Sequence, residues 1–449
     1  MVKININIFL LIIFFTASVF SQESESITVI GDSLVGKRIN GQQIREVIGN
    51  VIMTQEDVRI TCDKAIQYIT KNEAHLFGNV RAVQDTILIR SNTAFYYGNE
   101  KITQSNTGVT LNDGVVELHA VNGKYFFDEK KAVFSKDVVL IDTSNTLRSD
   151  HLTYFDKEDK AIAVGNVIIS DSTSSISADS LIHFREIKHT FAFGNVEIVD
   201  TASSLRITGE ELEDIDAENY TRIDGEPLLV QIDTTESGSL DTLIIRCKVM
   251  EAVEDSSRKL IATDSVKIIR GEFASVNHKS ILYRDEDKIE TIKPGEEQPA
   301  PILWYGESQV VGDTVFIYLD ENVLKQIDIN GNALIISINE DFEFRFDQVS
   351  GDKVKLFFEN DELNKTEVFG KVLSIYYMYD EEEPNGLVKA SSQRASIEFD
   401  EGRIVDVKLF GSPESEFHPE NKIIGKEKDF ILPTFILYDN RPQKEKILN

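Results

Sequence analysis

Apolar side chains recur at fixed positions along the first half of this sequence, in a pattern suited to binding the acyl chains of a lipid. A motif that begins Gly49-Asn50-Val51 returns every 29 residues, and valine fills its third position in six successive copies. These valines are Val51, Val80, Val109, Val138, Val167 and Val196. Nine residues after each valine stands Ile or Leu, namely Ile60, Ile89, Leu118, Leu147, Ile176 and Leu205. Seventeen residues after five of the valines stands an aromatic residue, namely Tyr68, Tyr97, Phe126, Phe155 and Phe184.

These columns allow two arrangements. If the sheet that carries them is open, they line a continuous apolar groove, where burial of an acyl chain contributes ~0.8 kcal/mol per CH₂. If the sheet is closed, the same side chains pack on one another as a solid core. For the groove, the expected lipid contacts are Val80, Ile89, Val109, Leu118, Phe126, Val138, Leu147, Phe155, Val167, Ile176 and Phe184.

Catalytic and metal-binding motifs are missing from the sequence. It has no Gly-x-Ser-x-Gly, no His-Glu-x-x-His and no glycine-rich phosphate loop. Its seven histidines share neither a repeat position nor a metal-ligand spacing. Asp142, Asp171 and Asp200 recur with the repeat, and a repeated scaffold position is a poor place for a unique acid and base. We predict no enzyme activity, no cofactor and no metal site. An enzyme acting on surface glycans is an alternative that ranks behind a lipid carrier and a structural protein.

The repeat also predicts the elements that position these columns. Apolar residues two positions apart lie on one face of a β-strand, and Gly or Asn before the valine favours a turn. Because one copy has no partner for its apolar face, successive copies must stack. We predict an all-β fold, an elongated stack of 29-residue repeats, built either as a parallel solenoid or as an antiparallel rolled sheet. Its two terminal edges need a cap or another chain. Cys62 falls in a column of small residues and is expected to be packed and unreactive.

The sequence divides into five segments. Lys3, an apolar run over residues 8–15 and a cleavage pattern before Gln22 are typical of a secretory signal peptide. Regular repeats end after Leu205, and looser copies follow an acidic stretch. The predicted segments are a signal peptide (1–21), a β-repeat domain (22–208), a junction (209–240), a second, less regular β domain (241–410) and a C-terminal tail (411–449).

The charge of the chain argues against one class of partner. Among 449 residues, 47 Lys and Arg face 76 Asp and Glu, which gives a net charge of −29. Nucleic-acid binding requires clustered Lys and Arg, so we expect no nucleic-acid partner. The two cysteines are too few for a disulfide framework or a zinc cluster. The signal peptide predicts an exported protein.

Several short motifs resemble the OstA-like (LptA-like) family, the periplasmic β-stack proteins of lipopolysaccharide transport. They are the Gly-Asn-Val starts at Gly49, Gly78, Gly165 and Gly194, Gly-Asn-Ala at Gly331, and Asp-Ser-Leu at Asp32 and Asp179. The resemblance covers residues 27 to about 410 and implies a β-jellyroll, also called a β-taco. Proteins of that family hold lipid chains inside and join like domains end to end.

For this chain the resemblance implies a non-enzymatic carrier in the periplasm or at the outer membrane. Its expected partners are lipid A acyl chains of lipopolysaccharide, other β-stack proteins at its two edges, and the outer-membrane translocon. The chain resembles two consecutive domains of the family and ends at Asn449 without alternating membrane strands, so we expect it not to be the family's barrel member. Anionic headgroups would project into solvent, with divalent ions screening the acidic rim. The alternative is a structural or adhesive β-solenoid with a closed core and no lipid.

Overall fold

The structure is a computed structural model that describes most of the chain. It covers residues 26–448 except 40, 144, 235–239, 256–257, 321–322, 340–341, 343, 360–361, 381–382 and 401–402. The predicted signal peptide, residues 1–21, lies outside the described residues. The described chain forms two compact units, which we treat separately. Unit 1 comprises Met1–Gly114 and Asn122–Glu129, and unit 2 comprises Val115–Val121 and Lys130–Asn449.

The prediction of an all-β fold is confirmed, and the strands pair antiparallel wherever the structure describes them, as in the β-meander of unit 1. The sequence allowed either a parallel solenoid or an antiparallel rolled sheet. The structure shows that the repeats form a rolled antiparallel sheet. The strands of unit 1 are β1 (Thr28–Ile30), β2 (Ser33–Ile39), β3 (Gln42–Gln55), β4 (Val58–Tyr68), β5 (Glu73–Gln84), β6 (Ile87–Tyr97), β7 (Ile102–Ser105), β8 (Val109–Asn112) and β10 (Asn122–Phe126).

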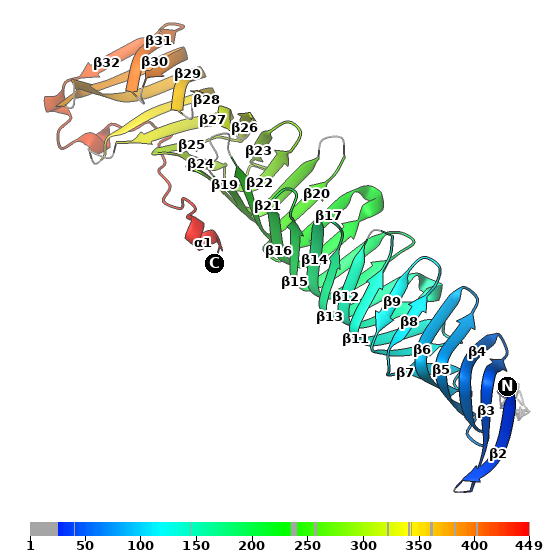
Figure 1. The fold of residues 1–449 in the computed structure, drawn as a ribbon. Coiled ribbons are helices and arrows are strands. Elements are labelled where there is room, and N and C mark those ends of the chain that lie inside the picture. Colours follow the sequence, from blue (N-terminus) through cyan, green and yellow to red (C-terminus); the bar gives the residue numbers. More distant parts are fainter. Residues whose placement is uncertain are drawn as a thin grey trace, which may run out of the picture. The chain divides into compact units, whose positions relative to one another are not determined.

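Unit 2 has the same antiparallel construction, and most of its strands pair with their neighbours in the chain (Figure 1). Its strands are β9 (Glu117–Ala120), β11 (Lys131–Ile141), β12 (Thr146–Phe155), β13 (Lys160–Ser170), β14 (Ser174–Phe184), β15 (His189–Asp200), β16 (Leu205–Ile215), β17 (Tyr220–Asp224), β18 (Leu228–Thr234), β19 (Leu240–Arg246), β20 (Val249–Val253), β21 (Lys259–Arg270), β22 (Phe273–Tyr283), β23 (Lys288–Ile292), β24 (Ile302–Tyr305), β25 (Ser308–Val311), β26 (Thr314–Asp320), β27 (Val323–Ile338), β28 (Phe346–Glu359), β29 (Glu362–Asp380), β30 (Glu383–Asp400), β31 (Arg403–Phe410) and β32 (Glu414–His418). The four 3₁₀ turns that the structure describes are Asp156–Glu158, Asp216–Glu218, Glu420–Lys422 and Glu427–Asp429, and the helix α1 is Lys444–Leu448.

The segment predicted as a junction, residues 209–240, contains strands: most of β16, then β17 and β18. A single apolar core runs past it inside unit 2, from Ala178 to Ile397. The division into two β domains at this place stays a prediction.

The Gly-Asn motif forms a β-bulge near the middle of five long strands. In β5, Gly78 and Asn79 have φ values of +74° and +47°, and the register against β6 shifts between Phe77 and Val80. Two consecutive left-handed residues insert one extra residue and bend the strand. The same bulge occurs in β3, β13, β15 and β27, and with Gly370-Lys371 in β29. Within each unit we call these bends the spine.

Each Gly-Asn bulge is covered by an aspartate. This aspartate lies either in a neighbouring strand or directly before that strand. In unit 1, Asn79 Nδ2 donates to Asp63 Oδ2 at 2.9 Å. The pairs Asn50–Asp32, Asn166–Asp150, Asn195–Asp179 and Asn332–Asp313 make the same bond at 2.8–2.9 Å. The Gly-Asn and Asp-Ser-Leu motifs of the sequence are therefore the two halves of one clasp along the spine.

Replacing Gly78 by Ala will destabilise unit 1 by about 2 kcal/mol or more. Left-handed backbone costs an L-residue roughly 1–2 kcal/mol, and a Cβ at this position would lie well inside contact distance of the Asp63 carboxylate. Gly108→Ala is the matched control, because Gly108 also has positive φ (+95°) but a Cβ there meets nothing within 4 Å. Urea unfolding should show a clearly larger loss for Gly78→Ala; equal losses would mean that the clasp contributes nothing.

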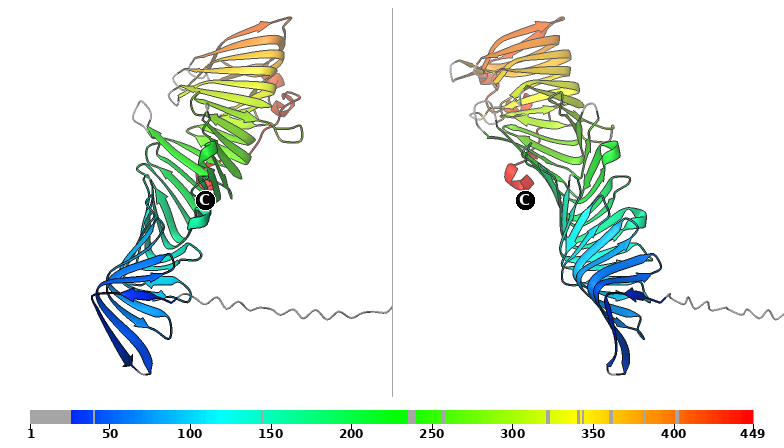
Figure 2. Two further views of the ribbon diagram at one scale, coloured as in Figure 1. Left: turned by 90° about the vertical axis from the view of Figure 1, so that its right-hand side faces the viewer. Right: turned by 45° about the vertical axis from the view of Figure 1, so that its right-hand side comes forward.

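The side chains that point inward change parity at the spine. In β4, Val58, Ile60 and Cys62 are buried before the bend, and Ala65 and Gln67 after it. Each long strand thus contributes one half to each of two walls, and both halves face a common interior. The first wall carries the Val and Ile/Leu columns, and the second wall begins at the far side of the spine. Figure 2 shows these strands from two further directions.

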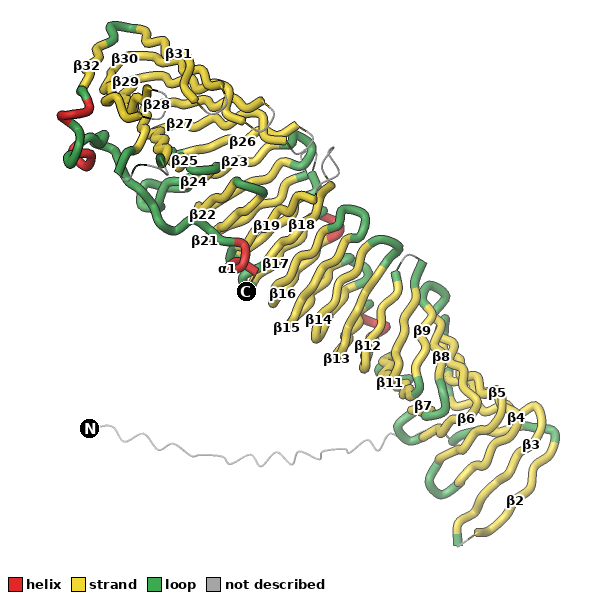
Figure 3. The backbone as a smooth tube through the Cα atoms, turned by 60° about the vertical axis from the view of Figure 1, so that its left-hand side comes forward, coloured by secondary structure: helices red, strands yellow, loops and turns green. Residues whose placement is uncertain are grey.

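Most of the predicted C-terminal tail (411–449) is a strap on the outer face of unit 2, while its first part forms β32 of the sheet. After β32, residues 419–448 run back past β28, β25 and β22 and end in α1 beside β19 (Figure 3). Ile423 and Leu432 pack into one outer apolar cluster with Leu334 and Ile336, and Ile447 packs into another with Trp304. We call residues 419–448 the C-terminal strap.

Two glutamines of the sheet hold the backbone of the strap. Gln348 Nε2 donates to the carbonyl of Phe430 at 3.1 Å, and its Oε1 accepts from the amide of Leu432 at 2.8 Å. Gln309 makes the same pair of bonds, with Ile436 O and Tyr438 N, both at 2.8 Å. The side chains therefore pair with an extended backbone as a neighbouring strand would.

Candidate lipid-binding interior

The aliphatic residues predicted to contact lipid line the interior of the two units. In unit 1, Val80, Ile89 and Val109 are buried, and in unit 2 so are Leu118, Val138, Leu147 and Val167, while Ile176 is half-buried against the core. They come from alternate positions on the first wall, as the period of two requires. Contact of these residues with a lipid stays a prediction.

The aromatic column lies on the opposite side of the sheet, so its expected inward direction is wrong. Phe126 is half-buried between two buried neighbours, Tyr125 and Phe127, and successive strand residues face opposite ways. Phe155 and Phe184 lie outside in the same manner, with the Lys160 ammonium 5.7 and 5.5 Å from their ring centroids. The parity change at the spine moves the inward position by one residue.

The residues of the repeat that place an aromatic ring in the interior stand one place earlier. They are Tyr96, Tyr125 and Tyr154, all buried, and His183 follows at the same spacing. In unit 1 the rings of Tyr125 and Phe127 meet edge to face with centroids 4.9 Å apart. Tyrosine at three positions spaced 29 residues apart was a signal available in the sequence, but the neighbouring column of Tyr and Phe is longer and obscured it.

The interior is packed in the structure. In unit 2 the core from Ala178 to Ile397 is continuous, and its members come from both walls. In unit 1, Leu76 of the second wall and Leu111 of the first are both fully buried. An acyl chain would therefore have to separate the walls and replace contacts that the side chains now make with one another.

Both cysteines belong to this interior. Cys62 and Cys247 are buried free thiols, and burial raises the pKa of Cys62 to about 11 and of Cys247 to about 12. Each Sγ donates to the carbonyl two residues on, at Lys64 O (3.2 Å) and Val249 O (3.1 Å). Ser149 makes the same bond to His151 O. The small-residue column thus supplies a donor where the strand bends.

The terminal strands expose apolar side chains at a free edge. At the start of unit 1, β2 pairs only with β3 among the described strands, and Leu34, Val35 and Ile39 are exposed. At the end of unit 2, β31 and β32 pair with β30, and Val405 and Phe417 are exposed. Such edges are able to accept a further strand.

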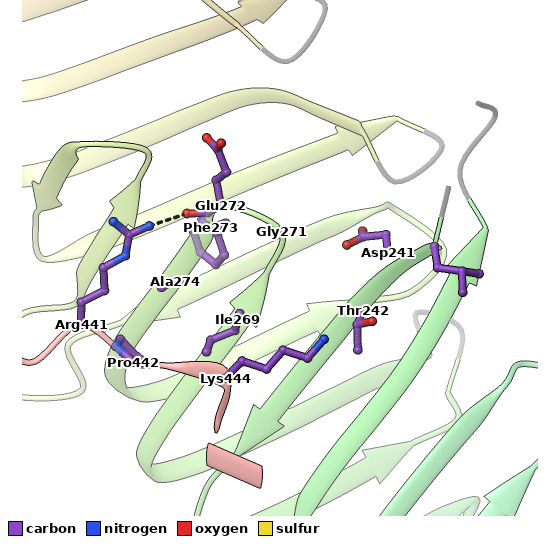
Figure 4. Close-up of a pocket in the computed structure, with 11 residues that line it drawn as sticks. Asp241, Thr242, Ile269, Gly271, Glu272, Phe273, Ala274, Arg441, Pro442 and Lys444 are labelled. Atoms are coloured by element: carbon purple, nitrogen blue, oxygen red, sulfur yellow. Dashed lines mark hydrogen bonds between the residues drawn. The ribbon is translucent and has the colours of Figure 1, made fainter. Parts of the chain in front are cut away.

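One pocket of about 320 Å³ lies on the outer face, between the end of the strap and β19, β21 and β22. Figure 4 shows Arg441 and Lys444 on one side of it and Asp241 on the other, with Arg441 donating to the carbonyl of Glu272. Asp241 is already paired with Arg270, at 2.5 Å. We assign the pocket to the seat of the strap.

Among the residues that the structure describes, no group of His, Cys, Asp and Glu is arranged to hold a metal ion. Within the same residues, no helix has the length and hydropathy needed to cross a membrane.

Fold and interior define the class of this chain: an antiparallel β-protein of stacked repeats around an apolar interior. The family resemblance is confirmed over residues 27–157, which match the family model described as "OstA-like protein". A comparison with curated proteins finds no match.

A similar solved structure is that of LptH from Pseudomonas aeruginosa, described as the LptA homologous periplasmic component of the conserved lipopolysaccharide transport device. It is 16% identical over 29% of this chain and 76% of that chain, with a TM-score of 0.15.

Proposed function

We propose that this chain is a non-enzymatic periplasmic carrier that passes lipopolysaccharide along its apolar interior toward the outer membrane. The observation that carries the proposal is the interior itself: aliphatic columns repeat every 29 residues on a scaffold whose first part is OstA-like. A repeated apolar lining suits a long hydrocarbon ligand, because each buried CH₂ contributes ~0.8 kcal/mol wherever it stands along the column.

The free edges support the proposed partners. Exposed apolar side chains on β2 and on β31 and β32 suit addition of strands from other β-stack proteins and, at one end, from an outer-membrane translocon. The net charge of −29 requires that anionic headgroups stay outside, where solvent and divalent ions screen the carboxylates.

A photocrosslinking amino acid at Phe127 of the full chain will capture lipid A, whereas the same amino acid at Phe126 will not. Phe127 is 1% exposed and faces the interior; Phe126, its neighbour, is half-buried on the outer side. The benzophenone analogue of phenylalanine suits both positions. Purified protein is mixed with lipid A, irradiated and examined by mass spectrometry. Capture at neither position in folded protein would favour a structural protein with a closed core and no lipid. Equal capture at both positions would mean that lipid binds without entering the interior.

A further inference from the structure

The two walls of unit 1 meet along their free edges, opposite the spine. The first wall ends at the β3–β4 and β5–β6 turns, and the second wall ends at the β4–β5 and β6–β7 turns. Side chains at these ends join the walls in a line that we call the seam. At the spine the strands run on from one wall to the other, whereas at the seam side-chain hydrogen bonds join the two walls.

Glutamine and tyrosine make the seam in successive repeats. Tyr96 Oη donates to Gln55 Oε1 at 2.8 Å, and Gln55 Nε2 donates to the carbonyl of Gly98 at 2.9 Å. One repeat further on, Tyr125 Oη donates to Gln84 Oε1 at 3.4 Å. Both pairs span 41 residues, and their members lie 29 residues apart, so the seam repeats with the scaffold.

A third position of the seam carries an unpaired acceptor. Gln67 stands one repeat before Tyr96 and donates from Nε2 to Ile27 O at 3.4 Å. Its Oε1 is buried without a hydrogen-bond partner in the described structure. A buried amide oxygen without a donor costs roughly 1–3 kcal/mol, which a ligand N–H or O–H would recover.

The seam lies between the apolar interior of unit 1 and charged groups outside it, so it matches the boundary between the acyl chains and the headgroup of a lipid. Inside it are fully buried hydrocarbon and aromatic rings, including Leu76 and Phe127. Outside it are charges: Lys101 Nζ lies 2.5 Å from Glu56 and 3.1 Å from Asp128. Acyl chains inside and a headgroup outside would place the ester and amide linkages of the lipid at the level of the glutamine and tyrosine side chains.

We propose that Gln55, Gln67, Gln84, Tyr96 and Tyr125 form a lateral gate in unit 1 that opens to admit an acylated lipid and then binds its ester and amide linkages. When the walls part, the two tyrosine O–H groups and the Gln55 N–H become donors for a linkage carbonyl, and each glutamine oxygen accepts from a linkage N–H or hydroxyl. Gln84 Nε2 keeps its bond to Asp57 Oδ2, at 2.8 Å, because both residues lie on the first wall. The bonds lost on opening are thus replaced by bonds to the cargo. This inference rests on the proposed carrier function.

The gate is tested in the full chain with the photocrosslinking residue at Phe127 and lipid A as the probe. The double variant Tyr96→Phe/Tyr125→Phe removes only the two hydroxyls of the seam. We expect it to capture lipid A about tenfold faster, because two hydrogen bonds no longer oppose opening, and to release it faster in a chase with unlabelled lipid A. Tyr97→Phe is the matched control, since Tyr97 adjoins Tyr96 but faces outward, and it should behave as the parent chain.

The outcomes separate the gate from the carrier function. Equal capture rates in all three chains would overturn the gate while leaving lipid binding intact. No capture in the parent chain would overturn the carrier function and the gate with it. If the tyrosine variant fails to fold, Gln55→Met/Gln84→Met removes the acceptors with side chains of similar length and must show the same acceleration.

Discussion

Replacing Gln309 and Gln348 together by Leu will release the C-terminal strap and destabilise unit 2 by on the order of 4 kcal/mol. Both glutamines are at most 1% exposed, and each satisfies one amide and one carbonyl of the strap. Leucine keeps most of the volume but leaves four backbone groups without partners. Because an unpaired buried polar group costs roughly 1–3 kcal/mol, the variant loses more than the bonds themselves contribute.

The single tryptophan reports this release directly. Trp304 lies in the outer cluster with Ile447 of the strap, so its fluorescence should shift to longer wavelength when the strap leaves. The amides of Leu432 and Tyr438 should lose protection from hydrogen exchange at the same time. Gln393→Leu, an exposed position on β30, is the control and should change neither signal. Unchanged emission and unchanged protection in the double variant would show that the apolar anchors hold the strap without the glutamines.

The strap also explains why the repeat could not be followed through the second half of the sequence. In β27, Ile327, Ile329 and Ala333 belong to the interior, whereas Leu334 and Ile336 belong to the outer cluster under the strap. Strands buried on both faces read as continuous apolar runs rather than as an alternation. The regular columns of the first half depend on an outer face that is mostly polar. No property of residues 419–448 alone shows that they return to cover unit 2.

In the first half, the sequence predicts which side chains face the interior, but only on the first wall, up to the spine. Positions such as Val80 and Ile89 on the first wall follow a period of two from the Gly-Asn bulge, and the structure buries them. Continuing the same count past the spine leads to Phe126, which lies outside, instead of Tyr125, which lies inside. Sequence periodicity assigns a face only within a stretch of regular strand. The bulge was recognisable as a turn, but its effect on the strands beside it is a property of the paired sheet.

The second prediction concerns Asp347, whose ionisation makes the stability of unit 2 depend on pH. Val349, two residues on, belongs to the interior of unit 2, while Gln348 between them faces the strap, so Asp347 lies on the interior side. Burial raises its pKa from 3.8 to about 6, although its carboxylate accepts a hydrogen bond from the amide of Tyr377 at 2.8 Å. Burial also raises the pKa of Tyr376, and the charge of Asp347 adds to that rise. The charged form of Asp347 is thus disfavoured in the folded chain.

Asp347→Asn will stabilise unit 2 by about 3 kcal/mol at pH 7 and have little effect at pH 4. The folded state binds the Asp347 proton more tightly than the unfolded state, so this group lowers the free energy of unfolding as the pH rises from about 4 to about 6. Asparagine keeps an oxygen for the Tyr377 amide and carries no charge, so the variant avoids that loss. Urea unfolding at pH 4, 5, 6 and 7 measures the difference between the two chains.

Glu186→Gln is the matched control, because it also removes one carboxylate but at an exposed position, in the turn before β15. Its difference from the parent chain should not grow between pH 4 and pH 7. A stabilisation by Asp347→Asn that is equal at all four pH values would attribute the effect to packing instead of ionisation. A growing difference would mean that the interior of unit 2 holds a carboxylate whose charge weakens this part of the sheet near neutral pH. Because that carboxylate stands on the strand that anchors the strap, its ionisation and the docking of residues 419–448 then act on the same strand, β28.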